Sequence, residues 1–142
     1  MFPYSSDSLF LGKYCIIAAI DWSRDADMTI AQDARPAIAV PAEIGALVSV
    51  VRETLRPSEI WLFGSRARGT ARLDSDWDLL AVLDDDAAAE LSDPVLAWRI
   101  SRESNVPSTL LTTRRSDLEE MWGLPNTLGY DLSREGVRLI VD

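Results

Sequence analysis

The sequence predicts a small α+β (α/β) domain, in which helices pack on a mixed β-sheet. Three observations favour this fold class. Short apolar runs typical of buried strands recur in the C-terminal part of the chain. Segments with helical spacing alternate with these runs, and prolines, glycines or clustered charges mark the boundaries. From residue 41 the order is helix, strand, strand, helix, strand, helix, strand, which suits helices covering a sheet.

Length and composition predict one globular domain with an N-terminal extension. The chain has 142 residues, of which 47% are hydrophobic and 26% charged, as in ordinary soluble domains. Residues 1–40 mix aromatic, Ser, Asp and Ala residues without sustained periodicity. We therefore assign the extension to residues 1–40 and the folded domain to residues 41–142. Residues 14–20 would add a strand if the extension is ordered, and Met28 is an alternative start.

Charge and missing residue types exclude several kinds of function. A net charge of −9 disfavours nucleic-acid binding, which depends on Lys and Arg at phosphates. The chain has no histidine and only one cysteine, Cys15, which excludes Ser-His and Cys-His catalysis, His-zinc sites and an intrachain disulfide. The longest apolar run, residues 15–20, is too short to cross a membrane. We expect a cytoplasmic protein.

The first elements of the domain follow from spacing and from proline. A helix is predicted after Pro41, which suits a first turn, and it ends before Pro57. Its apolar residues lie at helical spacing, at Ile44, Leu47, Val48, Val51 and Leu55. Two apolar runs of buried-strand type come next, at residues 60–63 and 79–83.

The later elements follow from capping residues and β-branched residues. Residues 87–104 are predicted as one helix or two, because Asp93 and Pro94 form a cap and a first-turn proline. A strand is predicted over residues 106–113, which are rich in β-branched residues. Residues 116–121 begin with a Ser-Asp-Leu-Glu capping box, which predicts a helix capped by its own serine. A final helix and strand are predicted at residues 126–134 and 137–141.

The turn after the first strand has the features of an anion site. Gly64 allows a tight turn and the close approach of a ligand. If a helix starts at Ser65, its free N–H groups and the hydroxyl face the turn, and Arg66 and Arg68 add positive charge. An ordinary strand-to-helix turn with solvated arginines explains the same residues, so this stretch alone does not decide between the two.

Two aspartates open the second strand. Asp76 and Asp78 are two residues apart and would point to the same side. Such carboxylates repel each other unless a cation lies between them. Asp-x-Asp is often a solvated edge, but here Asp78 leads directly into a buried apolar run, where unneeded charge is costly. Trp77 would face the other side and pack there.

The combined pattern is more specific than its parts. It consists of a strand, Gly-Ser, ten residues, Asp-x-Asp and a second strand. This resembles the nucleotidyltransferase superfamily of DNA polymerase beta, and most closely its minimal single-domain (MNT) branch. The resemblance covers about residues 41–142 and leaves residues 1–40 unexplained. It rests on Gly64, Ser65, Arg66, Arg68, Gly69, Ser75, Asp76, Asp78 and Leu79.

The resemblance implies a division of roles. The Gly64-Ser65 turn, with Arg66 and Arg68, would bind the triphosphate of ATP or another nucleoside triphosphate. The catalytic residues Asp76 and Asp78 would hold two Mg²⁺ ions, or one. The reaction would transfer a nucleoside monophosphate, AMP in the case of ATP, to a hydroxyl and release pyrophosphate.

One element of the family pattern is missing. Active members carry a third carboxylate on a later strand, and Thr109 stands where that acid belongs. No Asp or Glu lies between Ser104 and Arg115. Glu103 is the nearest upstream acid, but it ends the predicted helix, and the acids at 84–86 are expected in a solvated loop. Threonine is neutral and a poor metal ligand, so catalysis is either weak or completed by another acid or a partner.

Partners follow from the same resemblance. Minimal nucleotidyltransferases of this size commonly serve as antitoxins of HEPN-family ribonucleases, some by AMPylation of a tyrosine. Such a HEPN-type toxin is therefore the expected partner, and the sequence leaves a homo-oligomer open. Tryptophans are candidate interface anchors or core residues: Trp22, Trp61, Trp98 and Trp122.

Three functions remain open at this point. The first is a magnesium-dependent nucleotidyltransferase that modifies a protein hydroxyl. The second is a degenerate nucleotidyltransferase that binds nucleotide or partner without transfer. The third is a small α/β protein unrelated to nucleotides. Antibiotic modification fits less well, because the chain has no room for the extra domain of aminoglycoside nucleotidyltransferases.

Overall fold

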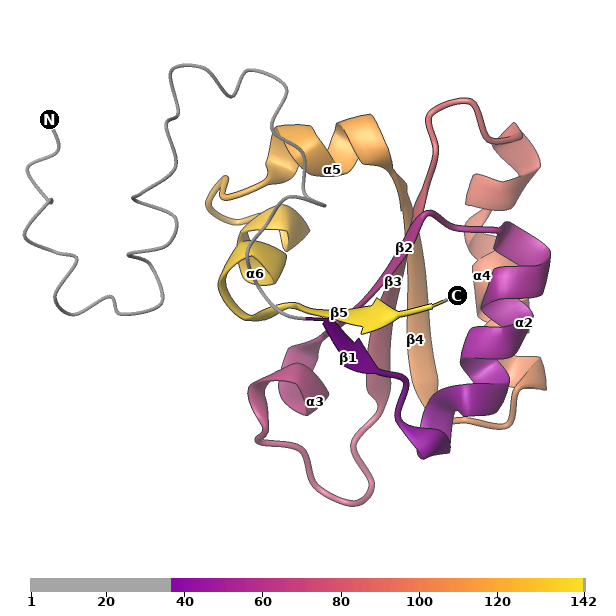
Figure 1. The fold of residues 1–142 in the computed structure, drawn as a ribbon, viewed down its shortest axis with the longest axis vertical. Coiled ribbons are helices and arrows are strands. Elements are labelled where there is room, and N and C mark those ends of the chain that lie inside the picture. The colour runs from indigo at the N-terminus through magenta and orange to yellow at the C-terminus, as the bar shows by residue number, and fades with distance from the viewer. Residues whose placement is uncertain (1–36, 142) are drawn as a thin grey trace, which may run out of the picture. The chain divides into compact units, whose positions relative to one another are not determined.

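The computed structural model of the protein describes residues 37–141. Within them a five-stranded sheet has the order β1-β5-β2-β3-β4 (Figure 1). The strands are β1 (Ala37–Ala39), β2 (Glu59–Phe63), β3 (Trp77–Leu83), β4 (Ser108–Arg114) and β5 (Val137–Ile140). Pairs β1–β5 and β3–β4 are parallel, whereas β2 is antiparallel to both β3 and β5. The predicted mixed sheet of an α+β fold is confirmed.

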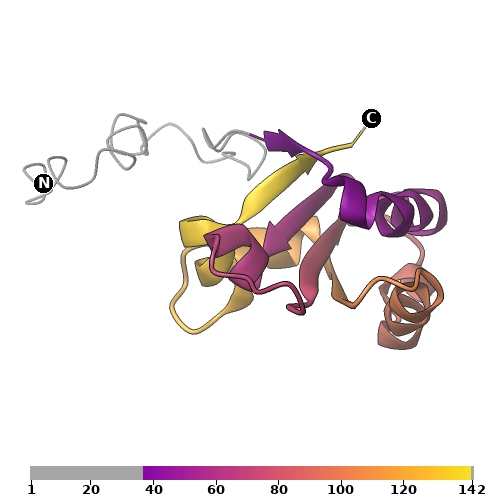
Figure 2. The ribbon, with the colours of Figure 1, turned by 90° about the horizontal axis from the view of Figure 1, so that it is seen from below.

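Helices cover both faces of the sheet (Figures 1 and 2). On one face lie α2 (Gly45–Leu55) and α4 (Pro94–Glu103), preceded by the 3-10 turns η4 (Ala42–Ile44) and η5 (Ala89–Ser92). On the other lie α3 (Gly64–Arg68), α5 (Arg115–Met121) and α6 (Leu128–Glu135). Among the described residues, no helix has the length and apolarity that a membrane span requires.

The main core lies between the sheet and helices α2 and α4. The helical stripe predicted from spacing is buried there, with Ile44, Leu47 and Val51 fully inaccessible to solvent. Strand β3 contributes alternate residues to it, since successive side chains of a strand point to opposite faces. These residues are Leu79, Ala81 and Leu83. Asp78, Leu80 and Val82 alternate with them along the strand and therefore face the side of α3, α5 and α6.

Two details differ from the sequence analysis. Strand β1 lies N-terminal to residue 41 and pairs with β5, so the sheet begins within the segment assigned to the extension. The capping box predicted at Ser116 is wrong. Helix α5 begins at Arg115 with no side-chain bond at its N-cap, and Asp85 accepts a hydrogen bond from the Ser116 N–H instead. Ser116 lies inside the first turn, where its hydroxyl cannot cap.

The remaining predicted elements are present with small shifts in their ends. The segment predicted as one helix or two is η5 followed by α4, and Asp93 accepts from the Val95 N–H as the predicted cap. Trp61 is buried and packs against Trp122, whereas Trp98 is 58% exposed. Residues 14–20 and Trp22 lie outside the described residues, and the assignment of residues 41–142 to one domain stays a prediction.

Candidate active site

The site is built around the bend between β2 and α3. Phe63 ends the strand in extended conformation, and Gly64 begins the helix with φ of +73°. A Cβ at Gly64 would overlap Oδ2 of Asp78. Glycine is therefore required here both by the backbone conformation and by the carboxylate that lies against it.

Strand pairing brings Asp78 to this bend. Phe63 and Asp78 are partners in the antiparallel β2–β3 ladder, so the residue before the bend faces the first acid of the strand. Asp76 lies two residues earlier, just outside β3, and is exposed. The structure thus brings Gly64, Asp76 and Asp78 together, with Ser65 half-buried in the first turn of α3.

The two carboxylates interact electrostatically. Burial raises the pKa of Asp78 above its ordinary value, the negative charge of Asp76 raises it further, and Arg68 opposes both effects. Two acids in this state attract a cation, since a positive ion between them removes their repulsion. The chemistry of the donors therefore fits a hard divalent cation such as Mg²⁺, which takes carboxylate oxygens and completes its shell with water or phosphate.

A third carboxylate does not join these two within residues 37–141. No group of three Asp, Glu, Cys or His residues suited to a metal occurs there. Thr109 is the β4 partner of Asp78 in the parallel ladder, and its side chain therefore lies on the same face. Thr109 is exposed. The structure places the threonine where the sequence analysis expected the missing acid.

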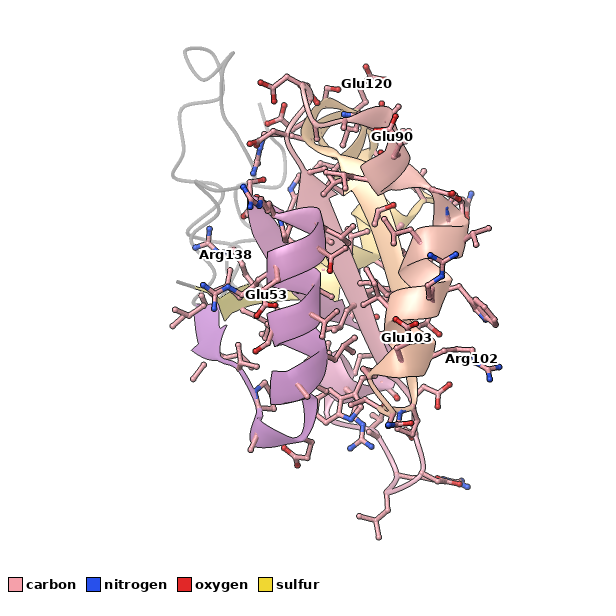
Figure 3. The ribbon with its side chains drawn as sticks, turned by 90° about the vertical axis from the view of Figure 1, so that its right-hand side faces the viewer. Glu53, Glu90, Arg102, Glu103, Glu120 and Arg138 are labelled. Atoms are coloured by element: carbon pink, nitrogen blue, oxygen red, sulfur yellow. The ribbon has the colours of Figure 1, made fainter. Side chains whose placement is uncertain are left out.

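The acids considered in the sequence analysis as replacements lie elsewhere in the fold. Glu103 is exposed at the end of α4, the helix that covers the opposite face of the sheet (Figure 3). Asp84, Asp85 and Asp86 are exposed beyond the other end of β3.

The two arginines of the turn both contact protein groups. The Arg66 Nη2 donates to the backbone oxygens of Ser75 at 2.8 Å and Leu73 at 3.3 Å. Its guanidinium stacks 4.5 Å from the centre of the Trp77 ring. Arg68 forms an ion pair with Glu135 at 3.0 Å, with 45% of its side chain exposed. The resemblance predicts both arginines as phosphate ligands. The Arg66–Trp77 pair is not predicted, because its only sequence signal is an aromatic residue between the two acids.

Comparison with known proteins shows the family of the chain. A family model described as a nucleotidyltransferase domain matches residues 45–123. The chain belongs to this family. The matched segment of the nucleotidyltransferase domain runs from α2 into the turn after α5 and includes the bend, both aspartates and Thr109.

Two solved structures are similar at low identity. One is a toxin–antitoxin crystal structure with AMP-PNP, at 18% identity and a TM-score of 0.46, covering 69% of this chain and 72% of that one. The other is a candidate nucleotidyltransferase from Sulfolobus solfataricus, at 19% identity and a TM-score of 0.38, covering 57% and 81%. No curated protein matches the chain. The family assignment rests on the family model.

Proposed function

We propose that this nucleotidyltransferase domain transfers a nucleoside monophosphate, AMP from ATP, to a protein hydroxyl. The observation that carries the proposal is the position of Asp78. Its carboxylate lies against Gly64 at the bend, and its pKa is raised by burial and by Asp76. The residues proposed for the anion and those proposed for the cation therefore lie next to each other, which supports binding of a metal–nucleotide complex.

Each residue has a defined task in this proposal. Asp76 and Asp78 would hold Mg²⁺, which neutralises phosphate charge and activates an attacking hydroxyl when bound. Gly64 leaves room for the Asp78 carboxylate, and the Ser65 hydroxyl would donate to a phosphate oxygen. Arg68, whose exposed ion pair with Glu135 is weak, can turn toward the same anion.

The proposed acceptor is a toxin of the HEPN type, with this chain as its antitoxin. The support is the spacing of Gly64-Ser65 and Asp76-x-Asp78, ten residues apart, which the resemblance associates with this branch. The similar structure of a toxin–antitoxin with AMP-PNP is a system of the same kind, but its similarity to this chain is too low to support the proposal. A cytoplasmic location is proposed on the same basis.

A second candidate function is binding without transfer. Thr109 favours it, because the residue beside Asp78 on β4 is neutral and cannot complete a metal site or accept a proton near neutral pH. In that case the domain binds nucleotide or partner, and inhibition comes from the complex alone.

The test uses the full chain with ATP labelled at the α-phosphate, Mg²⁺ and a candidate acceptor protein. Label transfer that disappears in Asp76→Ala supports the enzyme. A stable complex without label supports the binding module. If ATP with Mg²⁺ neither binds nor raises the Tm, the nucleotide interpretation is wrong.

Thr109→Asp sharpens the test. Residue 109 is exposed, so the substitution is tolerated by the fold, and it places a carboxylate on the same face as Asp78. We expect transfer to increase by about tenfold or more, the scale of a general base, with Thr109→Asn as the neutral control. Equal rates in the Thr109→Asp and Thr109→Asn variants would show that the third acid is not what limits the site.

A further inference from the structure

We propose that Arg66 is a positioning residue, which anchors the loop of residues 70–75 so that Asp76 lies beside Asp78. The inference rests on the proposed function for the role of the two aspartates. It assigns to Arg66 a task different from phosphate binding, and it separates Arg66 from Arg68, two arginines that look equivalent in the sequence.

The side chain of Arg66 donates its hydrogen bonds to the backbone of the loop. Nη2 donates to the Ser75 carbonyl at 2.8 Å and to the Leu73 carbonyl at 3.3 Å. Both acceptors belong to the loop, and Ser75 directly precedes Asp76. A planar guanidinium suits this task because its donors have fixed directions, whereas an ammonium group is a point charge.

The backbone on both sides of Asp76 is held by hydrogen bonds. On its N-terminal side the Ser75 carbonyl is held by Arg66. On its C-terminal side the Trp77 N–H donates to the Pro107 carbonyl at 2.9 Å. Asp76 itself lies outside the strand and is exposed, so its place beside Asp78 depends on these two hydrogen bonds, one from a side chain and one between backbone groups.

The Arg66 guanidinium is partly buried against the loop. It stacks on the Trp77 ring at 4.5 Å, and its Nε is buried without a hydrogen-bond partner. The loop adds a turn of its own, in which the Arg72 N–H donates to Ser75 Oγ at 2.8 Å. If Arg66 turned toward a phosphate, its stack on Trp77 and both hydrogen bonds to carbonyls would be lost. If Arg68 did so, only its exposed ion pair with Glu135 would be lost.

The experiment compares Arg66→Lys with Arg68→Lys by amide hydrogen exchange in the full chain. Both variants keep the positive charge. We expect exchange of the amides of residues 72–77 to be about fivefold or more faster in Arg66→Lys, because the anchored turn opens more often. The Arg68→Lys control should leave these amides unchanged. The proposal would be overturned if residues 72–77 were equally protected in the two variants. It would also be overturned if exchange in Arg66→Lys became faster evenly over the whole sheet.

A second measurement tests the consequence for cation binding. Calorimetric titration with Mn²⁺ should show affinity reduced about tenfold or more in Arg66→Lys, the range found when a residue supporting a metal ligand is lost. Affinity should be unchanged in Arg99→Lys, because Arg99 is exposed on α4, which covers the opposite face of the sheet. Ser75→Ala removes the hydrogen bond from the Arg72 N–H to Ser75 Oγ but leaves Arg66 and the Ser75 carbonyl in place. This variant should also have a lower affinity for Mn²⁺. Unchanged Mn²⁺ affinity in Arg66→Lys would refute the positioning role. If the unmodified chain binds neither Mn²⁺ nor ATP, the proposed function fails, and hydrogen exchange still decides whether Arg66 anchors the loop.

Discussion

Acidic residues stand at both ends of strand β3, in opposite surroundings. Asp76 and Asp78 open the strand, and Asp84, Asp85 and Asp86 follow it. At the opening end the two carboxylates repel each other, and the pKa of Asp78 is raised by burial first and by Asp76 second. At the closing end the pKa of Asp85 is lowered, chiefly by the hydrogen bond from the Ser116 N–H.

The difference lies in what the rest of the chain supplies. At the closing end, Arg114 Nη1 donates to the backbone oxygens of Asp84, Asp85 and Ala87 at 3.2, 3.0 and 3.0 Å. Asp85 Oδ1 in turn accepts from the first turn of α5 at 2.9 Å. The Asp85 carboxylate is thus compensated by the fold. At the opening end, burial and the charge of Asp76 outweigh the opposing effect of Arg68 on Asp78. This arrangement is expected of a binding site rather than of a structural ion pair.

The largest effect should appear in transfer activity. Asp78→Asn keeps the size of the side chain but removes one of two metal-binding carboxylates, and we expect at least about 100-fold loss, since even supporting residues of metal sites cost up to that much. Asp85→Asn, a change of the same kind at the other end of β3, should leave the rate unchanged. Both are measured as label transfer from ATP. Equal losses would show that the two ends do not differ in function.

Much of the fold was predictable because its signals are local. The stripe on α2 and the cap at Asp93 depend on residues within a few positions of each other, and both are present as expected. Strand β1 was missed because three residues carry little pattern, and its partner β5 lies near the other end of the chain. The Asp85 cap on α5 was missed for the same reason, since its partner is 31 residues away.

The candidate site was predictable to the level of residue types. The spacing of glycine and aspartates indicated a shared site, and the pairing of Phe63 with Asp78 supplies the geometry. The task of Arg66 was not predictable, because its acceptors are the backbone carbonyls of residues 73 and 75. A carbonyl is common to every residue type, so it leaves no mark in the sequence.

An intermediate effect should follow from adding one methyl group at the bend. Gly64→Ala meets both an unfavourable φ of +73° and the Asp78 carboxylate, so we expect a loss of about 2–4 kcal/mol in the free energy of unfolding together with loss of transfer. Gly69→Ala is the matched control. Its φ is +79° but nothing lies within 4 Å of the added methyl, so it should cost about 1–2 kcal/mol of backbone strain alone.

The comparison of these two variants isolates the contact with Asp78. Denaturant unfolding measures the stability of each, and label transfer measures activity. Gly69→Ala should retain transfer. If both alanines have the same cost and the same activity, Asp78 does not depend on the space at residue 64.

The smallest effect should appear in stability and its dependence on pH. The native state binds the Asp78 proton more tightly than the unfolded chain does, so ionisation of this group destabilises the fold as the pH rises from about 4, the ordinary aspartate value, through the raised pKa. Asp78→Asn should therefore raise the Tm at pH 7, because the amide does not carry the charge that burial penalises and that Asp76 repels. The pKa shift of Asp85 has the opposite sign. Its contribution to the stability of the fold is present above about pH 4 and is lost as the pH falls through its lowered pKa. Asp85→Asn should lower the Tm at pH 7, and both differences from the unmodified chain should shrink near pH 3, as followed by circular dichroism. A fall in Tm for both variants would mean that the acids at the opening of β3 are compensated by the fold after all, and the contrast between the two ends of the strand would be lost.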